Sequence, residues 1–127
     1  MTLSDCTILI IDDAYTIREY LRHTLQQLEI HHIQEAATGE QGIALFKAQR
    51  HDVIFLDIEL PDANGQALLK QIKEIEEAAH VVMITAHNTV ENVQQSIMAG
   101  ASGFVAKPFS PQKIKNIIER CMAAKLS

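Results

Sequence analysis

The chain has 127 residues, of which 47% are hydrophobic and 21% are charged, and its net charge is −5. This length fits one compact domain, and this composition argues against a disordered chain. No apolar run approaches the roughly 18 residues of a membrane span, and the first residues lack the basic start and apolar stretch of a signal peptide. We therefore expect a cytoplasmic protein that acts on neither membranes nor nucleic acid.

Short apolar runs alternate with stretches whose hydrophobic residues recur at helical spacing. In chain order we predict a strand over residues 8–11, a helix over 14–28, a strand over 33–36, a helix over 39–50, a strand over 53–56, a helix over 68–75, a strand over 81–84, a helix over 88–99, a strand over 104–106 and a helix over 114–121. Five strands that alternate with five helices indicate a parallel sheet built by right-handed crossovers.

The strength of each apolar run predicts where its strand lies in the sheet. The runs at 8–11, 53–56 and 81–84 are continuous and should be central, whereas 33–36 and 104–106 are weaker and should be edges. This agrees with the doubly wound, flavodoxin-like order 2-1-3-4-5. We therefore predict an α/β fold with this five-stranded sheet and five helices.

Acidic residues follow two strands that this order places side by side. Asp12 and Asp13 end the first strand, and Asp57 ends the third. Ligands of such sheets bind at the carboxyl ends of strands, so the three carboxylates should converge there. Their repulsion calls for a counter-ion, and Mg²⁺ fits because it prefers oxygen ligands. Zinc would require histidine or cysteine at this place.

The fourth and fifth strands deliver Thr85 and Lys107 to the same edge of the sheet. A hydroxyl and an ammonium that face carboxylates and a metal form a cage for a phosphoryl group. Asp57 is then positioned as a nucleophile that forms an acyl phosphate.

The chain resembles the response-regulator receiver domains of two-component signalling, the CheY-like family, along essentially its whole length. The residues that carry the resemblance are Asp12-Asp13, Leu56-Asp57, Pro61, Gly65, Thr85-Ala86, Gly100-Ala101-Ser102-Gly103-Phe104 and Lys107-Pro108-Phe109. The resemblance implies that Asp57 accepts phosphate from a histidine kinase or a histidine phosphotransfer protein.

The resemblance also implies roles for the neighbouring residues. Mg²⁺ would be held by Asp13, Asp57 and the backbone carbonyl of Glu59, with Asp12 acting through water. Lys107, joined to Pro108 by a cis bond, would pair with the phosphoryl group. Thr85 would swing toward that group and Phe104 would follow it inward. The family often has tyrosine in place of Phe104, and its motor-binding member uses the tyrosine hydroxyl, which Phe104 lacks.

Glu59 and His87 lie two positions after Asp57 and Thr85. They either tune the lifetime of the acyl phosphate or are plain surface residues, and the sequence leaves both interpretations open.

The main interpretation is a single receiver domain over residues 1–127, with no output domain following and no enzymatic turnover of its own. It would switch the binding of a downstream target protein. An alternative is a phosphorelay intermediate that passes phosphate to a histidine phosphotransfer domain. A phosphohydrolase with an Asp nucleophile would require a cap insertion, and a flavodoxin-like redox protein would place flavin phosphate against Asp12 and Asp13.

Charge suggests where the signal leaves the protein. Residues 107–127 carry a net charge of +4 and the remainder carries −9. The fourth helix has a single charge and an uncharged outer face, and the fifth helix offers lysines beside it, a composition that favours a protein interface. The predicted partner face consists of Gln94, Gln95, Met98, Phe104, Lys113 and Lys115. With one acid on the fourth helix, we expect a monomer when the protein is unphosphorylated.

Overall fold

The computed structural model describes residues 2–86 and 89–123. Five strands and five α-helices alternate along this chain after a short 3₁₀ helix, η1 (Leu3–Asp5). The strands are β1 (Thr7–Ile11), β2 (His32–Ala36), β3 (Val53–Asp57), β4 (His80–Thr85) and β5 (Gly103–Ala106). The helices are α1 (Tyr15–Gln27), α2 (Gly39–Ala48), α3 (Gly65–Ile75), α4 (Val90–Met98) and α5 (Pro111–Cys121).

The strands form one parallel sheet in the order β2-β1-β3-β4-β5. The register pairs Ile11 with Leu56 and Asp57 with Ile84, so the ends of β1, β3 and β4 lie together at one edge. The strand order and the five helices confirm the predicted α/β fold class.

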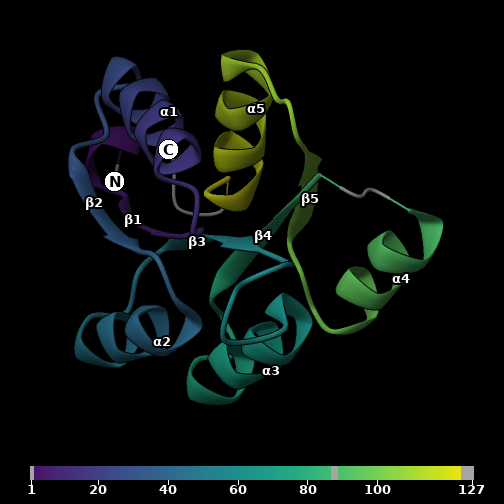
Figure 1. Cartoon of the computed structure of the whole chain (residues 1–127). Helices are drawn as coiled ribbons and strands as arrows, with labels where there is room; N and C mark the ends of the chain where they lie inside the picture. The colour runs from purple at the N-terminus through teal and green to yellow at the C-terminus, as the bar shows by residue number, and fades with distance from the viewer. Residues whose placement is uncertain (1, 87–88, 124–127) are drawn as a thin grey trace.

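Helices cover both faces of the sheet (Figure 1). α1 and α5 lie on one side, and α2 and α3 lie on the other, with α4 beside the edge strand β5. Successive residues of each central strand point to opposite faces, so a strand buried on both sides is apolar throughout. In β1, Ile8 and Ile10 pack toward α1 and α5, whereas Leu9 and Ile11 pack toward α2 and α3.

Side chains at the helix starts determine where the helices begin. Thr38, Asn64, Thr89 and Ser110 each accept backbone hydrogen bonds at the N-terminus of α2, α3, α4 and α5. Such caps satisfy amides that would otherwise lack partners. α1 differs, because its N-cap is Ala14, whose amide donates to Oδ1 of Asp12 at 2.8 Å. The start of α1 is therefore tied to the end of β1.

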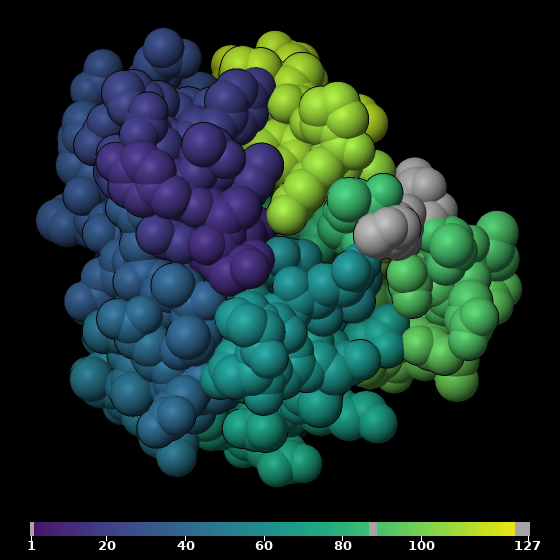
Figure 2. Space-filling view, viewed as in Figure 1, coloured from purple at the N-terminus to yellow at the C-terminus, as the bar shows by residue number. Residues whose placement is uncertain are grey.

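The buried face of α4 differs from the one that its sequence predicts, since the helical spacing of Val90, Val93 and Ile97 places these apolar residues on one inward face. Val90 and Ile97 recur at helical spacing but are 73% and 63% exposed, and Met98 is 87% exposed. Ser96 is fully buried instead. An edge helix over a short strand has little apolar surface to cover, so small residues can approach the sheet while larger ones remain in solvent. Figure 2 shows α4, in green, at the margin of the molecule.

Within the described residues, none of the helices combines the length and the apolar character that crossing a lipid bilayer would require.

Candidate functional site

Three carboxylates meet where β1 and β3 end. Oxygen atoms of Asp12, Asp13 and Asp57 all lie within 4.8 Å of one another. Asp12 is fully buried, Asp57 is 5% exposed, and Asp13 is exposed. The convergence expected from the strand order is therefore present, with one acid facing solvent and two recessed behind it.

Lys107 reaches this cluster from the end of β5. Its Nζ atom lies 3.0 Å from Oδ2 of Asp12 and 3.5 Å from Oδ2 of Asp57. Burial works against the charge on Lys107, but the bonds and charges of the two carboxylates outweigh it and raise the pKa of the ammonium. The Lys107–Pro108 peptide bond is cis, as the resemblance implied.

The Asp57 carboxyl group has a pKa above its ordinary value. Burial is the largest cause, and the charge of Asp12 adds to it. The amide of Glu59, which donates to Oδ1 of Asp57 at 3.1 Å, and the Lys107 ammonium oppose the shift. Asp57 is therefore a carboxylate held at a free-energy cost, which a bound cation or a bonded phosphoryl group can relieve.

The loop after β3 is built to hold Asp57 in place. The amide of Gly65 donates to the carbonyl of Ile58 at 2.7 Å, and a Cβ on Gly65 would collide with the carbonyl oxygen of Asp57. Asp62 accepts hydrogen bonds from the amides of Gly39 and Glu40, so the same loop is fastened to the start of α2. Glycine is required here because the start of α3 approaches the end of β3 so closely.

Thr85 and Phe104 lie on the neighbouring strands. Thr85 is fully buried at the end of β4, and its carbonyl accepts a 2.7 Å hydrogen bond from the amide of Lys107. Phe104 pairs with Met83 in the register of β4 and β5 and is half-buried against the core on the α2–α3 side. Thr85 follows Met83 by two residues, so Thr85 and Phe104 point to the same face of the sheet.

These residues fit a hard divalent cation. The cluster offers only carboxylate oxygens, within a span that one ion can bridge, and Mg²⁺ binds such ligands. The acidic triad is consistent with the Mg²⁺ site typical of receiver domains. The backbone at Glu59 lies beside it, since its amide is bonded to Asp57.

Glu59 also lines a polar hollow with Asn64 and Asn92, between the β3–α3 loop and α4. The other residue expected to tune the acyl phosphate, His87, lies outside the described residues, as does its neighbour Asn88.

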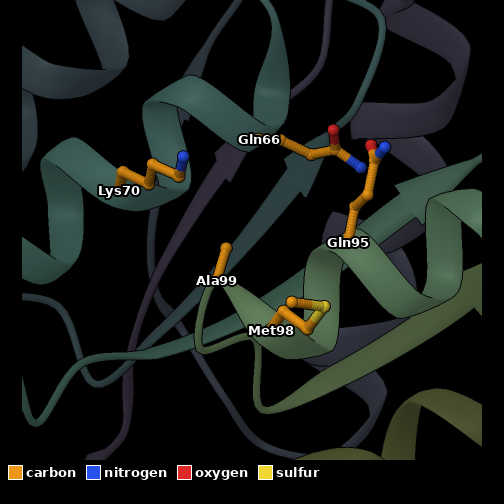
Figure 3. Close-up of a pocket in the computed structure, with 5 residues that line it drawn as sticks. All are labelled: Gln66, Lys70, Gln95, Met98 and Ala99. Atoms are coloured by element: carbon orange, nitrogen blue, oxygen red, sulfur yellow. The ribbon is translucent and has the colours of Figure 1, made fainter.

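The structure separates the predicted partner face into two parts. Gln95 and Met98 line a groove with Gln66 and Lys70 of α3, and Figure 3 shows Gln66 and Gln95 extending toward each other across it. Phe104 and Lys113 instead line a hollow of about 310 Å³ with Asn116, Ile117 and Arg120. Gln94 and Lys115 are exposed and line neither of these two hollows.

Sequence reasoning missed a group of ionic contacts behind the site. Arg18 donates from its NH1 atom to the backbone carbonyl of Asp12 at 2.7 Å, and its Nε atom lies 3.3 Å from Glu35. Arg22, one turn further along α1, bonds the same Glu35 at 2.6 Å. The spacing of Arg18 and Arg22 on one helix face was visible, but nothing in the sequence identified a backbone carbonyl as a partner.

Comparisons with known proteins agree with this geometry. A family model described as response regulator receiver domain matches residues 8–119. The chain is similar to the chemotaxis protein CheY of Halobacterium salinarum, at 29% identity over 92% of this chain and 97% of that protein. It is 32% identical to sporulation initiation phosphotransferase F of Bacillus subtilis, over 93% of this chain and 94% of that protein.

Among solved structures, the CheX–CheY–BeF3–Mg²⁺ complex from Borrelia burgdorferi matches with a TM-score of 0.87 at 27% identity, over 96% of this chain and 90% of that one. Receiver domains are typically phospho-acceptor switches rather than enzymes. The sequence match, the fold and the acidic pocket lead to the same result: this chain belongs to the response regulator receiver domain family.

Proposed function

We propose that this chain is a phospho-acceptor switch in which Asp57 takes a phosphoryl group from a phosphohistidine of a kinase or a phosphotransfer protein. The observation that carries the proposal is the position of Lys107, which lies within 3.5 Å of Asp57 at the meeting point of three carboxylates. A lone acidic cluster would bind cations; the added ammonium makes the place suitable for an anion bonded to Asp57.

The transfer requires little of the protein beyond placement. The N–P bond of the donor histidine breaks as an O–P bond to an Asp57 oxygen forms. The N–P electron pair returns to the ring nitrogen, and a donor ring protonated on its other nitrogen leaves as neutral imidazole. Mg²⁺, held by Asp13, Asp57 and the Glu59 carbonyl with Asp12 nearby, would supply positive charge against the phosphoryl oxygens. Lys107 supports the same charge from the other side, and the buried hydroxyl of Thr85 stands at the next strand end.

An apolar hollow beside the site supports docking of a protein donor. Ile17 and Tyr20 of α1 line it together with Pro108 and Phe109, directly after Lys107. The Tyr20 hydroxyl donates to the Phe109 carbonyl at 3.0 Å, which fixes this loop against α1. A donor seated there would bring its histidine to the opening above Asp57.

Output would pass through Thr85 and Phe104 to a downstream protein. Thr85 would turn to the phosphoryl group and Phe104 would move inward, altering the predicted partner face of Gln94, Gln95, Met98, Phe104, Lys113 and Lys115. The lysines would steer an acidic partner toward the exposed apolar residues of α4. We further propose that the resting chain is a monomer that acts in the cytoplasm.

A phosphorelay role is the second candidate. The similarity to sporulation initiation phosphotransferase F, a protein named for phosphate transfer, favours it. The relay would reverse the first reaction, moving the phosphoryl group from Asp57 to a histidine of a second protein. A phosphotransfer protein that gains label from the phosphorylated chain would distinguish the relay from a terminal switch.

The test of the proposal is labelling by a small phosphodonor. With acetyl phosphate and Mg²⁺, the chain should gain the mass of one phosphoryl group, and hydroxylamine should remove it. Asp57→Asn should abolish the gain, whereas Asp52→Asn, at the opposite end of β3, should retain it. Undiminished labelling of Asp57→Asn would refute the assignment, and continuous turnover of small phosphoesters would instead indicate a phosphohydrolase.

A further inference from the structure

We infer that Arg18 is a positioning residue of the metal site: it holds the peptide between Asp12 and Asp13 in the orientation that presents Asp13 to a divalent cation. The inference rests on the proposed function, because it assigns a residue to the metal site that the switch requires.

Arg18 is well fixed for a residue near the surface. Its side chain is 15% exposed, donates to the Asp12 carbonyl at 2.7 Å and pairs with Glu35 of β2 at 3.3 Å. The guanidinium also lies over the ring of Tyr15, 5.7 Å from its centroid. A planar group with donors on several edges can make these contacts together, which a lysine ammonium cannot.

The bonded carbonyl is the point where the metal-site loop leaves the sheet. The amide of Asp12 still belongs to the sheet, since it donates to Ala36 at 3.1 Å. The Asp12 carboxylate is held by the amide of Ala14 and by Lys107. The third polar group of Asp12 is its backbone carbonyl, which accepts the bond from Arg18. Because a peptide unit is rigid, the direction of this carbonyl fixes the plane of the peptide that joins Asp12 to Asp13.

Asp13 depends on this plane more than its neighbours do. Asp12 and Asp57 are buried and fixed by their surroundings, whereas Asp13 is exposed. An exposed carboxylate loses conformational freedom when it binds an ion, and a held peptide reduces that loss in advance. Groups that orient metal ligands in this way typically change metal affinity by roughly tenfold or more.

Electrostatics predicts the opposite sign, which makes the inference testable. A guanidinium near three carboxylates repels a divalent cation, so a purely electrostatic Arg18 would weaken metal binding and its removal would strengthen it. If Arg18 positions the loop, its removal weakens binding despite the lost repulsion.

Arg22 provides the matched control. It lies on the same helix face, bonds the same Glu35 at 2.6 Å and carries the same charge, but its partners are the side chains of Glu35 and Tyr15 and not the backbone of the metal-site loop. Arg22→Met therefore reproduces the charge loss and the disturbance of Glu35 without removing the carbonyl bond.

The experiment measures Mn²⁺ binding by the electron paramagnetic resonance signal of the free ion, with no phosphodonor present. We expect Arg18→Met to weaken binding about tenfold, Arg22→Met to stay within about twofold of the native chain, and Arg18→Lys to recover part of the loss. Unfolding midpoints in chelator identify the folded fraction, and Arg18→Lys carries the comparison if Arg18→Met does not fold.

Equal or tighter Mn²⁺ binding by folded Arg18→Met, or an equal loss in Arg22→Met, would overturn the inference. The result is separable from the proposed function. A native chain that binds Mn²⁺ but takes no label from acetyl phosphate would overturn the switch while the Arg18 comparison still holds.

Discussion

The Nζ atom of Lys107 lies 3.0 Å from Oδ2 of Asp12, a carboxylate with no exposed surface. This pair ties the end of β5 to the end of β1, although β3 and β4 lie between these two strands in the sheet. In the proposed switch, a phosphoryl group on Asp57 would offer this ammonium a further anionic partner beside the carboxylates of Asp12 and Asp57. A change in the balance between these partners would then act on the end of β5, because Lys107 follows that strand directly.

Lys107→Ala should accept phosphate on Asp57 yet lose most of the phosphorylation-dependent change in β5. The physical reason is that the variant keeps the acceptor but removes the ammonium that joins it to β5. The measurement is the set of amide chemical shifts of Phe104 and Val105 with and without beryllofluoride. Lys113→Ala serves as the control, and a native-like shift change in Lys107→Ala would refute the coupling.

Asp57→Asn should raise the free energy of unfolding in the absence of metal at neutral pH, by about 1 kcal/mol, the usual size of a stabilising substitution. The pKa of Asp57 is raised by burial and by Asp12, so the folded state prefers the neutral form. The charge on Asp57 therefore lowers the free energy of unfolding. This loss is absent at a pH below the ordinary carboxyl pKa and complete at a pH above the raised pKa of the folded state. The gain should therefore vanish at acidic pH.

Chemical unfolding in chelator measures this gain. Mg²⁺ should raise the native unfolding midpoint, because it binds only the folded state, and should raise that of Asp57→Asn less. Asp52→Asn, which removes a carboxylate at the opposite end of β3, is the control and should not show this gain in stability. An Asp57→Asn chain that is less stable than native at neutral pH would contradict the account of the site.

Glu59→Ala should change the rate at which the acyl phosphate is lost by more than about threefold, or ~0.7 kcal/mol. Glu59 lines the polar hollow between the β3–α3 loop and α4, from which water can approach. His87→Ala tests the second expected residue in the same assay, and Glu74→Ala on α3 is the control. Decay of both test variants at the native rate would make Glu59 and His87 plain surface residues.

Much of the fold could be predicted from the sequence, because central strands of a parallel sheet are apolar throughout and can be recognised by that composition. The runs 8–11, 53–56 and 81–84 are apolar throughout because helices cover both of their faces. The site followed from the strand order, since parallel strands bring their carboxyl ends to one edge.

What the sequence hid depends on tertiary contacts without a local pattern. The bond from Arg18 to the Asp12 carbonyl, and those from the amides of Gly39 and Glu40 to Asp62, join a side chain to distant or unmarked backbone. The exposed positions of Val90 and Ile97 were hidden for another reason. Periodicity reports that a helix is amphipathic, but it does not report how much sheet is available to cover it.

Lys113→Glu combined with Lys115→Glu should slow association with a partner several-fold at low salt. Reversing these charges removes the attraction that steers an acidic partner, and salt screens that attraction, so the gap should narrow at high salt. The measurement is the association rate of a partner protein that has been captured with the beryllofluoride-loaded chain. The phosphorylation kinetics of the double variant should match those of the native chain. Lys113→Glu alone should carry most of the effect, because Lys113 lies beside Phe104. Unaltered association at low salt would move the partner site elsewhere.

The free energy of unfolding should fall as the pH drops below about 6.5, the ordinary histidine pKa. His51 is buried, with its Nε2 atom 2.7 Å from Oε1 of Gln34, and burial lowers its pKa despite the neighbouring Asp52. As the pH falls, His51 therefore takes up a proton in the unfolded chain before it does so in the folded chain. The free energy of unfolding keeps falling until the pH drops below the pKa of His51 in the folded state.

One proton contributes a slope of at most about 1.4 kcal/mol per pH unit. His51→Leu should flatten this slope in urea unfolding between neutral and mildly acidic pH, and His31→Gln, an exposed position, should not. An unchanged slope in His51→Leu would assign the effect to other groups.

The crossing of the sheet by the Lys107–Asp12 pair also has a consequence during synthesis. Asp12, Asp13 and Asp57 leave the ribosome long before Lys107, the residue that balances their charge. A nascent chain that ends before β5 holds the acids without their cation, and lacks the strand that completes the edge of the sheet. The arrangement in which the Lys107 ammonium balances the buried carboxylate therefore forms only after β5 has been translated and has joined the sheet.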